Sequence, residues 1–183
     1  NLPGYDFTAF WARGGVMGSL MQKGGEPINL VPGLGDHISG YFMATGIMTA
    51  LYKALKTGKG DKVSTSLLHS SIFIQGIAMQ AAQYKDLGQT YPISRKEAEN
   101  PFNNTYKTSD DRFLQLSMPP FDVFYPKFMP LIGREDLVGN TRYTMDSITK
   151  NHLHTEFIEI LEEAFAKKTA KEWLDIFAKN DIP

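Results

Sequence analysis

The sequence predicts an α/β chain in two structural parts, and three observations support this prediction. Apolar residues recur near a 3.6-residue period through residues 36–55, which indicates a long helix. Residues 112–118 alternate between two faces, as a one-sided strand requires. Between these segments, residues 86–99 contain the best candidate for a connecting loop. We therefore predict a first part over residues 1–85, a linker over residues 86–99 and a small α+β part, a hairpin plus helices, over residues 100–183.

The first part begins with a helical pattern over residues 8–23, which Gly14-Gly15 interrupts. Residues 26–35 are rich in proline and glycine and predict a turn-rich segment. A long helix should follow over residues 36–55, where the apolar period is strongest. It should end in the glycine-containing turn of residues 56–60.

A short strand is the next element that we expect. Lys62–Ser66 predicts it because Val63 and Thr65 are β-branched. The apolar residues of Leu67–Tyr84 then predict a helix that stops near Gly88. The first part should therefore consist of helices with one strand between them.

The second part should open with a β-hairpin. Residues 104–108 predict its first strand, residues 109–111 its turn and residues 112–118 its second strand. Leu114 and Leu116 share one face of that second strand, so this face should pack against a core.

Three helices should complete the second part, over residues 121–132, 149–166 and 170–179. The last of them has the sequence of a capping box. Thr169 can accept a hydrogen bond from the amide of Glu172, and the Glu172 side chain can bond back to the amide of Thr169.

Composition excludes several classes of function. The chain has 183 residues, of which 42% are hydrophobic and 21% charged, as is ordinary for a soluble globular protein. A net charge of −1 and the lack of a basic tract give no electrostatic reason to bind nucleic acid or an anionic membrane. The absence of cysteine excludes disulfides and thiolate nucleophiles. No apolar run is long enough to span a bilayer, and we expect a cytoplasmic protein.

Both ends of the sequence resemble internal positions of a longer chain. Asn1 is not an initiator methionine, and Ile182-Pro183 directly follows a helical pattern. We therefore expect this chain to be a fragment of a larger protein.

Asp36 is the strongest candidate for a chemical role. Gly33 and Gly35 precede it, and glycine allows a ligand to approach the backbone closely. The simpler interpretation is that Asp36 is a helix N-cap, which is worth about 1 kcal/mol. The functional interpretation is a nucleophile, because a helix N-terminus stabilises negative charge and its amides can stabilise an oxyanion. These residues alone leave both interpretations open.

Other standard sites have little support in the sequence. His152 and His154 are two residues apart, so on a helix they would point in different directions, and we predict no metal site. The sequence also lacks a Gly-x-Ser-x-Gly elbow and a Walker loop, which argues against the corresponding hydrolases and nucleotide-binding proteins.

Three stretches carry a further signal because they occur together and in one order. They are Gly33–Gly40, with the sequence Gly-Leu-Gly-Asp-His-Ile-Ser-Gly, then Ala50–Leu68 and Asn104–Leu116. In that order they resemble the class III coenzyme A transferases, the family of formyl-CoA transferase and carnitine CoA-transferase. Residues 5–15 are similar to a subgroup acting on 2-hydroxy acids, the 2-hydroxyisocaproate and phenyllactate CoA-transferases of amino-acid-fermenting anaerobes.

The resemblance implies covalent catalysis by Asp36, which matches the aspartate of the family's Gly-Asp motif. Asp36 would move CoA between an acyl-CoA and a carboxylic acid through an aspartyl anhydride and an aspartyl-CoA thioester. CoA and acyl-CoA would be substrates and not permanently bound cofactors, with Gly33 and Gly35 beside the thioester. The family also implies two α/β domains and an interlocked homodimer, with residues 1–85 in the large domain and residues 100–183 in the small one.

Two alternatives stay open beside the transferase. The 2-methylacyl-CoA racemases resemble the family at the same aspartate but also use a histidine in a Gly-His-Asp stretch, where this chain has Gly4-Tyr5-Asp6. Tyrosine is a poor base at neutral pH because its phenol stays protonated there. The second alternative is a non-catalytic module that binds acyl-CoA or mediates dimerisation.

Overall fold

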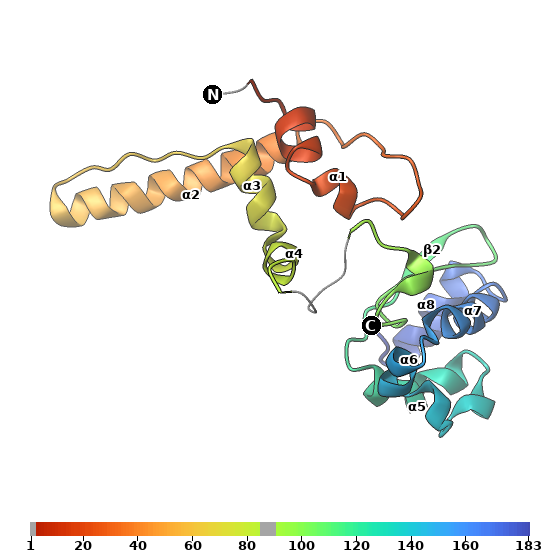
Figure 1. Ribbon diagram of the computed structural model, residues 1–183. Coiled ribbons are helices and arrows are strands. Elements are labelled where there is room, and N and C mark those ends of the chain that lie inside the picture. Colours follow the sequence, from red (N-terminus) through yellow and green to blue (C-terminus); the bar gives the residue numbers. More distant parts are fainter. Residues whose placement is uncertain (1–2, 85–90) are drawn as a thin grey trace. The chain divides into compact units, whose positions relative to one another are not determined.

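A computed structural model describes residues 3–84 and 91–183 of the chain (Figure 1). The chain divides into two compact units, Asn1–Ile93 and Ser94–Pro183. Within the described ranges, no helix is both long and apolar enough to cross a lipid bilayer.

The first unit begins with two short helices on either side of Gly14-Gly15, as the sequence predicts. They are the π-helix η1 (Asp6–Ala12) and the helix α1 (Val16–Ser19). A Cβ at Gly14 would lie only 2.1 Å from Ser71 Oγ, so this break is a close contact between segments. The helix does not continue to the predicted end at Lys23: α1 ends at Ser19, and the Lys23 amide donates to the carbonyl of Ile93 at 2.9 Å.

The long helix α2 (Leu34–Thr57) confirms the strongest helical pattern in the sequence (Figure 1). It begins two residues earlier than Asp36. Gly33 is its N-cap at φ 83°, and Gly58 ends it at φ 70°. Both conformations are left-handed and suit glycine, which explains why α2 is bounded by glycines and not by polar side-chain caps.

The strand predicted over Lys62–Ser66 is wrong. This segment is extended but pairs with no described strand, and it runs back along α2 (Figure 1). A Cβ at Gly46 would lie 2.6 Å from Val63 Cγ1, so Val63 packs where α2 has no side chain. The β-branched residues thus contact a helix, which a propensity for extended backbone does not exclude.

The helix predicted over Leu67–Tyr84 is divided into α3 (Leu67–Ile74) and α4 (Gly76–Ala81). Gln75 separates them, and its side-chain amide donates to the Gly14 carbonyl at 2.7 Å. A tertiary contact therefore fixes the break, which a helical period does not reveal. The predicted end near Gly88 and residues 86–90 of the predicted linker lie outside the described residues.

The core of the first unit is small. Its buried cluster consists of Phe10, Trp11, Val16 and Leu30 among the residues that the structure describes. The indole N–H of Trp11 donates to the carbonyl of Ile28 at 3.0 Å, which ties the turn-rich segment before α2 to η1.

The second unit contains the predicted hairpin with shorter strands. β1 (Thr105–Lys107) pairs antiparallel with β2 (Phe113–Gln115), and Tyr106 lies opposite Leu114. Phe113 is exposed while Leu116 is buried, so the alternation along this strand segment separates a solvent face from a core face.

Helices and short 3-10 helices complete the second unit: η2 (Arg95–Glu97), α5 (Phe121–Leu131), η3 (Glu135–Leu137), η4 (Thr141–Tyr143), α6 (Met145–Lys150), α7 (His154–Phe165) and α8 (Ala170–Lys179). The predicted helices over 121–132 and 170–179 are confirmed. The one predicted over 149–166 begins later, as α7 at His154, because the backbone is left-handed at His152, with φ 53°. Residues 149 and 150 belong to α6, which the prediction missed.

Aromatic side chains fill the core of the second unit. Phe102 stacks on Phe121 with ring centroids 4.4 Å apart, and Tyr106 stacks on Phe165 at 5.0 Å. Trp173 of α8 is buried beside them, and its indole N–H donates to the carbonyl of Phe165 at 3.0 Å. The hairpin and the helices thus share one core.

Candidate functional site

Asp36 lies in the first turn of α2, at the third helical position. The interpretation of Asp36 as the N-cap is wrong, because Gly33 occupies that position. The Asp36 side chain is exposed, and no described residue donates a hydrogen bond to its carboxylate. The N-terminus of a 24-residue helix favours negative charge at this place.

Asp6 caps α2 from a distant part of the sequence. Its Oδ2 accepts a hydrogen bond from the Gly33 amide at 2.7 Å, and its Oδ1 accepts one from the Gly35 amide at 2.9 Å. The Asp6 residue is only 6% exposed. One buried carboxylate therefore satisfies two amides that would otherwise have no partner at the helix N-terminus.

The contribution of Asp6 was missed in the sequence, where it appears only as the last residue of Gly4-Tyr5-Asp6. No local signal in the sequence points to this role, because Asp36 itself could serve as the N-cap of the predicted helix. Only with Gly33 as the N-cap, as the structure has it, do the first amides of α2 need an acceptor from elsewhere in the chain.

Gly35 is held in a tight contact with η1. A Cβ at this position would lie 2.3 Å from Phe10 Cγ and 2.4 Å from Asp6 Oδ1, so no side chain fits. Gly33 adopts the left-handed conformation that the N-cap requires. Both glycines thus have a structural explanation, and their predicted position beside CoA stays a prediction.

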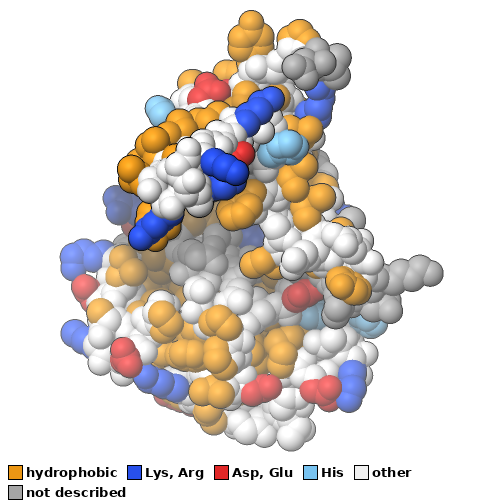
Figure 2. All heavy atoms as spheres, turned by 90° about the vertical axis from the view of Figure 1, so that its left-hand side faces the viewer, with side chains coloured by type: hydrophobic (Ala, Val, Ile, Leu, Met, Phe, Trp, Pro, Cys, Tyr) orange, Lys and Arg blue, Asp and Glu red, His pale blue; other side chains and the backbone are white. Residues whose placement is uncertain are grey.

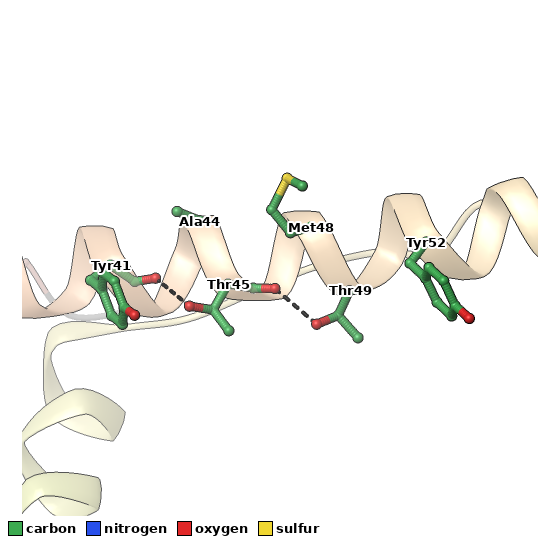
Figure 3. Close-up of a pocket in the computed structure, with 6 residues that line it drawn as sticks. All are labelled: Tyr41, Ala44, Thr45, Met48, Thr49 and Tyr52. Atoms are coloured by element: carbon green, nitrogen blue, oxygen red, sulfur yellow. Dashed lines mark hydrogen bonds between the residues drawn. The ribbon is translucent and has the colours of Figure 1, made fainter.

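One surface depression follows a single face of α2 and is lined by Tyr41, Ala44, Thr45, Met48, Thr49 and Tyr52 (Figure 3). The Thr45 and Thr49 hydroxyls donate to carbonyls one turn earlier in the helix, each at 2.9 Å. Its lining contains no carboxylate, histidine or lysine. This surface therefore offers apolar contact without acid–base groups.

A second depression joins the N-terminal segment, η1 and the start of α3. It is lined by Pro3, Gly4, Ala9, Arg13, Thr65, Ser66, Leu67 and Leu68. Arg13 is the charged member of this lining. The Ser66 hydroxyl already accepts the His69 amide at 3.1 Å as the N-cap of α3. Asp36 lines neither depression.

Residues 3–84 and 91–183 contain no group of three or more His, Cys, Asp or Glu side chains that could hold a metal ion. His154 is the first residue of α7, and His152 lies two residues before it, outside the helix. Asp36 is an exposed carboxylate at the N-terminus of α2, and His37 directly follows it in the sequence.

Much of the α2 surface is apolar and exposed. Within this helix only Gly35 and Ser39 are buried. Its exposed large apolar residues are Leu34, Tyr41, Ile47, Met48, Leu51, Tyr52 and Leu55. The face of the molecule that contains the C-terminal end of α2 carries exposed apolar side chains (Figure 2). Exposed apolar surface of this extent is typical of an interaction surface.

Two curated relatives are similar to the entire chain. The cinnamoyl-CoA:phenyllactate CoA-transferase of Clostridium sporogenes is 54% identical over 183 residues, which cover 100% of this chain and 44% of that protein. The (R)-2-hydroxy-4-methylpentanoate CoA-transferase of Clostridioides difficile is 38% identical, over 99% of this chain and 44% of that protein. The chain thus spans about half the length of the curated relatives that it matches, in line with the expected fragment.

A solved structure has a similar fold. The crystal structure of the hypothetical protein Rv3272 from Mycobacterium tuberculosis superposes with a TM-score of 0.76 at 25% identity, over 100% of this chain and 47% of that one. This match confirms the predicted α/β fold class. CoA-transferase family III matches residues 1–183. With its whole length covered by that match, the chain belongs to CoA-transferase family III.

Proposed function

We propose that the full-length protein containing this chain transfers CoA from an acyl-CoA to a carboxylic acid, with Asp36 as the nucleophile. The observation that carries the proposal is the exposed Asp36 carboxylate in the first turn of α2, with no hydrogen bond to it from any described residue. A carboxylate in that state can attack an electrophile without first breaking an internal contact.

The proposed reaction balances without water, ATP or a proton. An Asp36 oxygen attacks the carbonyl carbon of the acyl-CoA, the C–S bond breaks, and CoA leaves as a thiolate. The thiolate attacks the Asp36 carbonyl carbon of the resulting anhydride, which releases the donor acid as a carboxylate and leaves an aspartyl-CoA thioester. The acceptor carboxylate then attacks the aspartyl-CoA thioester, which releases CoA thiolate and forms a second anhydride. The thiolate attacks the acceptor carbonyl of that anhydride, which gives the new acyl-CoA and restores the Asp36 carboxylate. Covalent catalysis divides the exchange into four simpler displacements.

The names of the relatives support an acceptor class. One acts on phenyllactate and the other on (R)-2-hydroxy-4-methylpentanoate, both of which are 2-hydroxy acids with an apolar side chain. We therefore assign the same class of acceptor to the protein that contains this chain. Initial rates with a series of 2-hydroxy acids and their 2-deoxy analogues would measure how much the hydroxyl contributes.

Trapping of the covalent intermediate tests the mechanism. The full-length protein incubated with acyl-CoA and hydroxylamine should carry a hydroxamate on Asp36, detectable by mass spectrometry of its peptides. Asp36→Ala should abolish both transfer and trapping. Asp146→Ala is the control, because Asp146 is an exposed carboxylate in the first turn of α6 and pairs only with Lys150 within the described residues. An active protein with an unmodified Asp36 would contradict the proposal.

The racemase alternative has one supporting observation, because the alpha-methylacyl-CoA racemase of Mus musculus is 26% identical over 99% of this chain. Tyr5 opposes it, since racemases use a histidine at the matching position. Loss of stereochemistry in a 2-methylacyl-CoA, with no acceptor acid present, would favour racemisation. A full-length protein that binds acyl-CoA without either reaction would favour the non-catalytic module.

Three further implications of the family belong to the same proposal. They are the homodimer, the assignment of residues 1–85 and 100–183 to the large and small domains, and the cytoplasmic location. The exposed apolar surface of α2 supports an assembly in which this helix gains a partner. Light scattering of the full-length protein should give the mass of two chains, and a monomer mass would contradict the homodimer.

A further inference from the structure

We propose that Asp6 is a positioning residue, which keeps the Asp36 carboxylate directed away from the backbone of its own helix. This inference rests on the proposed function, because it takes Asp36 as the nucleophile. Asp6 itself touches backbone amides and neither the substrate nor the reacting atoms in this scheme.

The contact that matters is the one between Asp6 and the N-cap amide. In a capping box, a Glu or Gln side chain at the third helical position turns back and accepts the N-cap amide, and a carboxylate of Asp carries the same acceptor oxygens on a shorter side chain. In α2 the third position is Asp36, and the N-cap is Gly33. The Gly33 amide is already bonded to Asp6 Oδ2 at 2.7 Å, so it does not attract Asp36.

Another helix of this chain shows what happens when that amide is free for the third residue. In α8, Glu172 occupies the third position and Thr169 is the N-cap. Glu172 Oε2 accepts the Thr169 amide at 2.8 Å, so this carboxylate is fixed against its own backbone. The two helices differ in whether a remote carboxylate occupies the N-cap amide. They also differ in their third residue, which is the longer Glu172 in α8, and in their N-cap conformation, which is left-handed at Gly33 and extended at Thr169.

The surroundings of Asp6 hold it in place for this task. It is the first residue of η1, and it is 6% exposed. Phe10 of the same helix is fully buried and lies where a side chain at Gly35 would have to be. Each Asp6 oxygen accepts a different amide, so both oxygens are needed as acceptors.

Asp6→Asn in the full-length protein removes one of the two acceptors while conserving size. Its amide nitrogen cannot accept a hydrogen bond from Gly33 or Gly35, which leaves one of these amides for Asp36. We expect kcat for CoA transfer to fall about 10- to 100-fold, because the nucleophile is misplaced. KM for acyl-CoA should stay within about threefold, and the rate of hydroxylamine trapping should fall in parallel with kcat.

Asp110→Asn is a matched control for the loss of a remote cap. Asp110 Oδ1 accepts the Ala170 amide at the start of α8, at 3.0 Å, and the two residues are 60 positions apart in the sequence. This variant should lower thermal stability and leave kcat unchanged. If Asp6→Asn also lowers only stability, with kcat within twofold of the original protein, Asp6 is a structural cap and the proposal is overturned.

A second variant covers the case in which Asp6→Asn does not fold. Asp6→Glu keeps the charge, but its extra methylene displaces both oxygens from a site where Asp6 Oδ1 already lies close to Gly35. It should again lower kcat without raising KM, and an unchanged kcat would contradict the proposal. Asp36→Ala distinguishes failure of the proposed function from failure of this inference. A fully active Asp36→Ala protein would contradict the proposed function itself. An inactive Asp36→Ala protein beside a fully active Asp6→Asn protein would contradict only the positioning role of Asp6.

Discussion

At Gly35 the structure leaves no room for any side chain. The nearest atoms to a Cβ there belong to Phe10 and Asp6, at 2.3 and 2.4 Å. Gly35→Ala should therefore lower the free energy of unfolding of the full-length protein by about 1–3 kcal/mol, through overpacking between α2 and η1. Chemical denaturation followed by circular dichroism measures this change.

Gly40→Ala is the control, because Gly40 lies in the same helix with nothing within 4 Å of a Cβ. Alanine is the better helix former, so this change should raise stability by about 0.5–1 kcal/mol. We therefore expect the change in the free energy of unfolding to have opposite signs in Gly35→Ala and Gly40→Ala. Equal changes in stability in the two variants would mean that helix propensity, and not the contact with η1, governs the effect of alanine at position 35.

Glu162 of α7 predicts a pH dependence for the second unit. Burial alone would raise the pKa of this carboxyl, but hydrogen bonds from Lys96 and Arg95 outweigh burial and hold the pKa below its ordinary value of 4.5. A carboxyl whose pKa is lower in the folded state stabilises the fold above the ordinary value, and this stabilisation is lost as the pH falls through the folded pKa. Glu162→Gln should cost about 1.5–3 kcal/mol at pH 7.

The difference between Glu162→Gln and the original protein should shrink as the pH falls below 4.5. Denaturation curves at several pH values measure it. Glu163→Gln is the control, because Glu163 is the exposed neighbour on the same helix. A difference that stays constant down to pH 3, about 1.5 units below the ordinary value, would show that the ion pairs do not stabilise the fold through the Glu162 charge.

The residues of the candidate site differ in how far the sequence can reveal them. Asp36 could be found because a Gly-Asp pair before a helical period is a local pattern. Asp6 could not, since its two contacts lie 27 and 29 residues along the chain and depend on how η1 packs on α2. The same packing explains Gly35, whose lack of a side chain has a cause that lies in η1.

At the scale of elements, the capping box of α8 is the prediction that the structure confirms in atomic detail. Thr169 Oγ1 accepts the Glu172 amide at 3.3 Å, and Glu172 Oε2 accepts the Thr169 amide at 2.8 Å. Thr169→Ala should lower the free energy of unfolding by about 1 kcal/mol. Lys167→Ala, an exposed change just outside the cap, should have almost no effect, and equal losses in both variants would contradict a contribution from the cap.

The elements that the sequence misplaced share a physical cause. Val63 lies against Gly46 of α2, and Gln75 breaks a helical pattern by bonding to the Gly14 carbonyl. Periodicity and propensity describe a segment by itself, whereas these boundaries depend on contacts between distant segments. Helix α2 was predictable from its apolar period, and α8 was predictable from its period together with a capping box inside the segment, whereas the carboxylate that caps α2 is remote.

At the scale of the whole chain, the two units differ in how much apolar surface they bury by themselves. The second unit has a continuous core that joins the hairpin to its helices, with stacked rings such as Tyr106 and Phe165. In the described part of the first unit, the buried cluster has four residues, while most of α2 is exposed. Burial of apolar surface is the main favourable term in folding, so the second unit should be the more stable one in isolation.

Residues 94–183 produced alone should therefore unfold cooperatively, with a sigmoidal loss of helical circular dichroism and of near-UV signal from Trp173. Residues 1–93 produced alone should instead bind a hydrophobic dye and show no cooperative transition, because most of α2 is exposed among the described residues of that segment. Trp173→Ala is the internal check, since loss of a buried aromatic costs about 3–5 kcal/mol and should abolish the transition of a 90-residue unit or shift it strongly. A sharp transition in residues 1–93, or none in residues 94–183, would show that stability does not follow the distribution of buried apolar side chains.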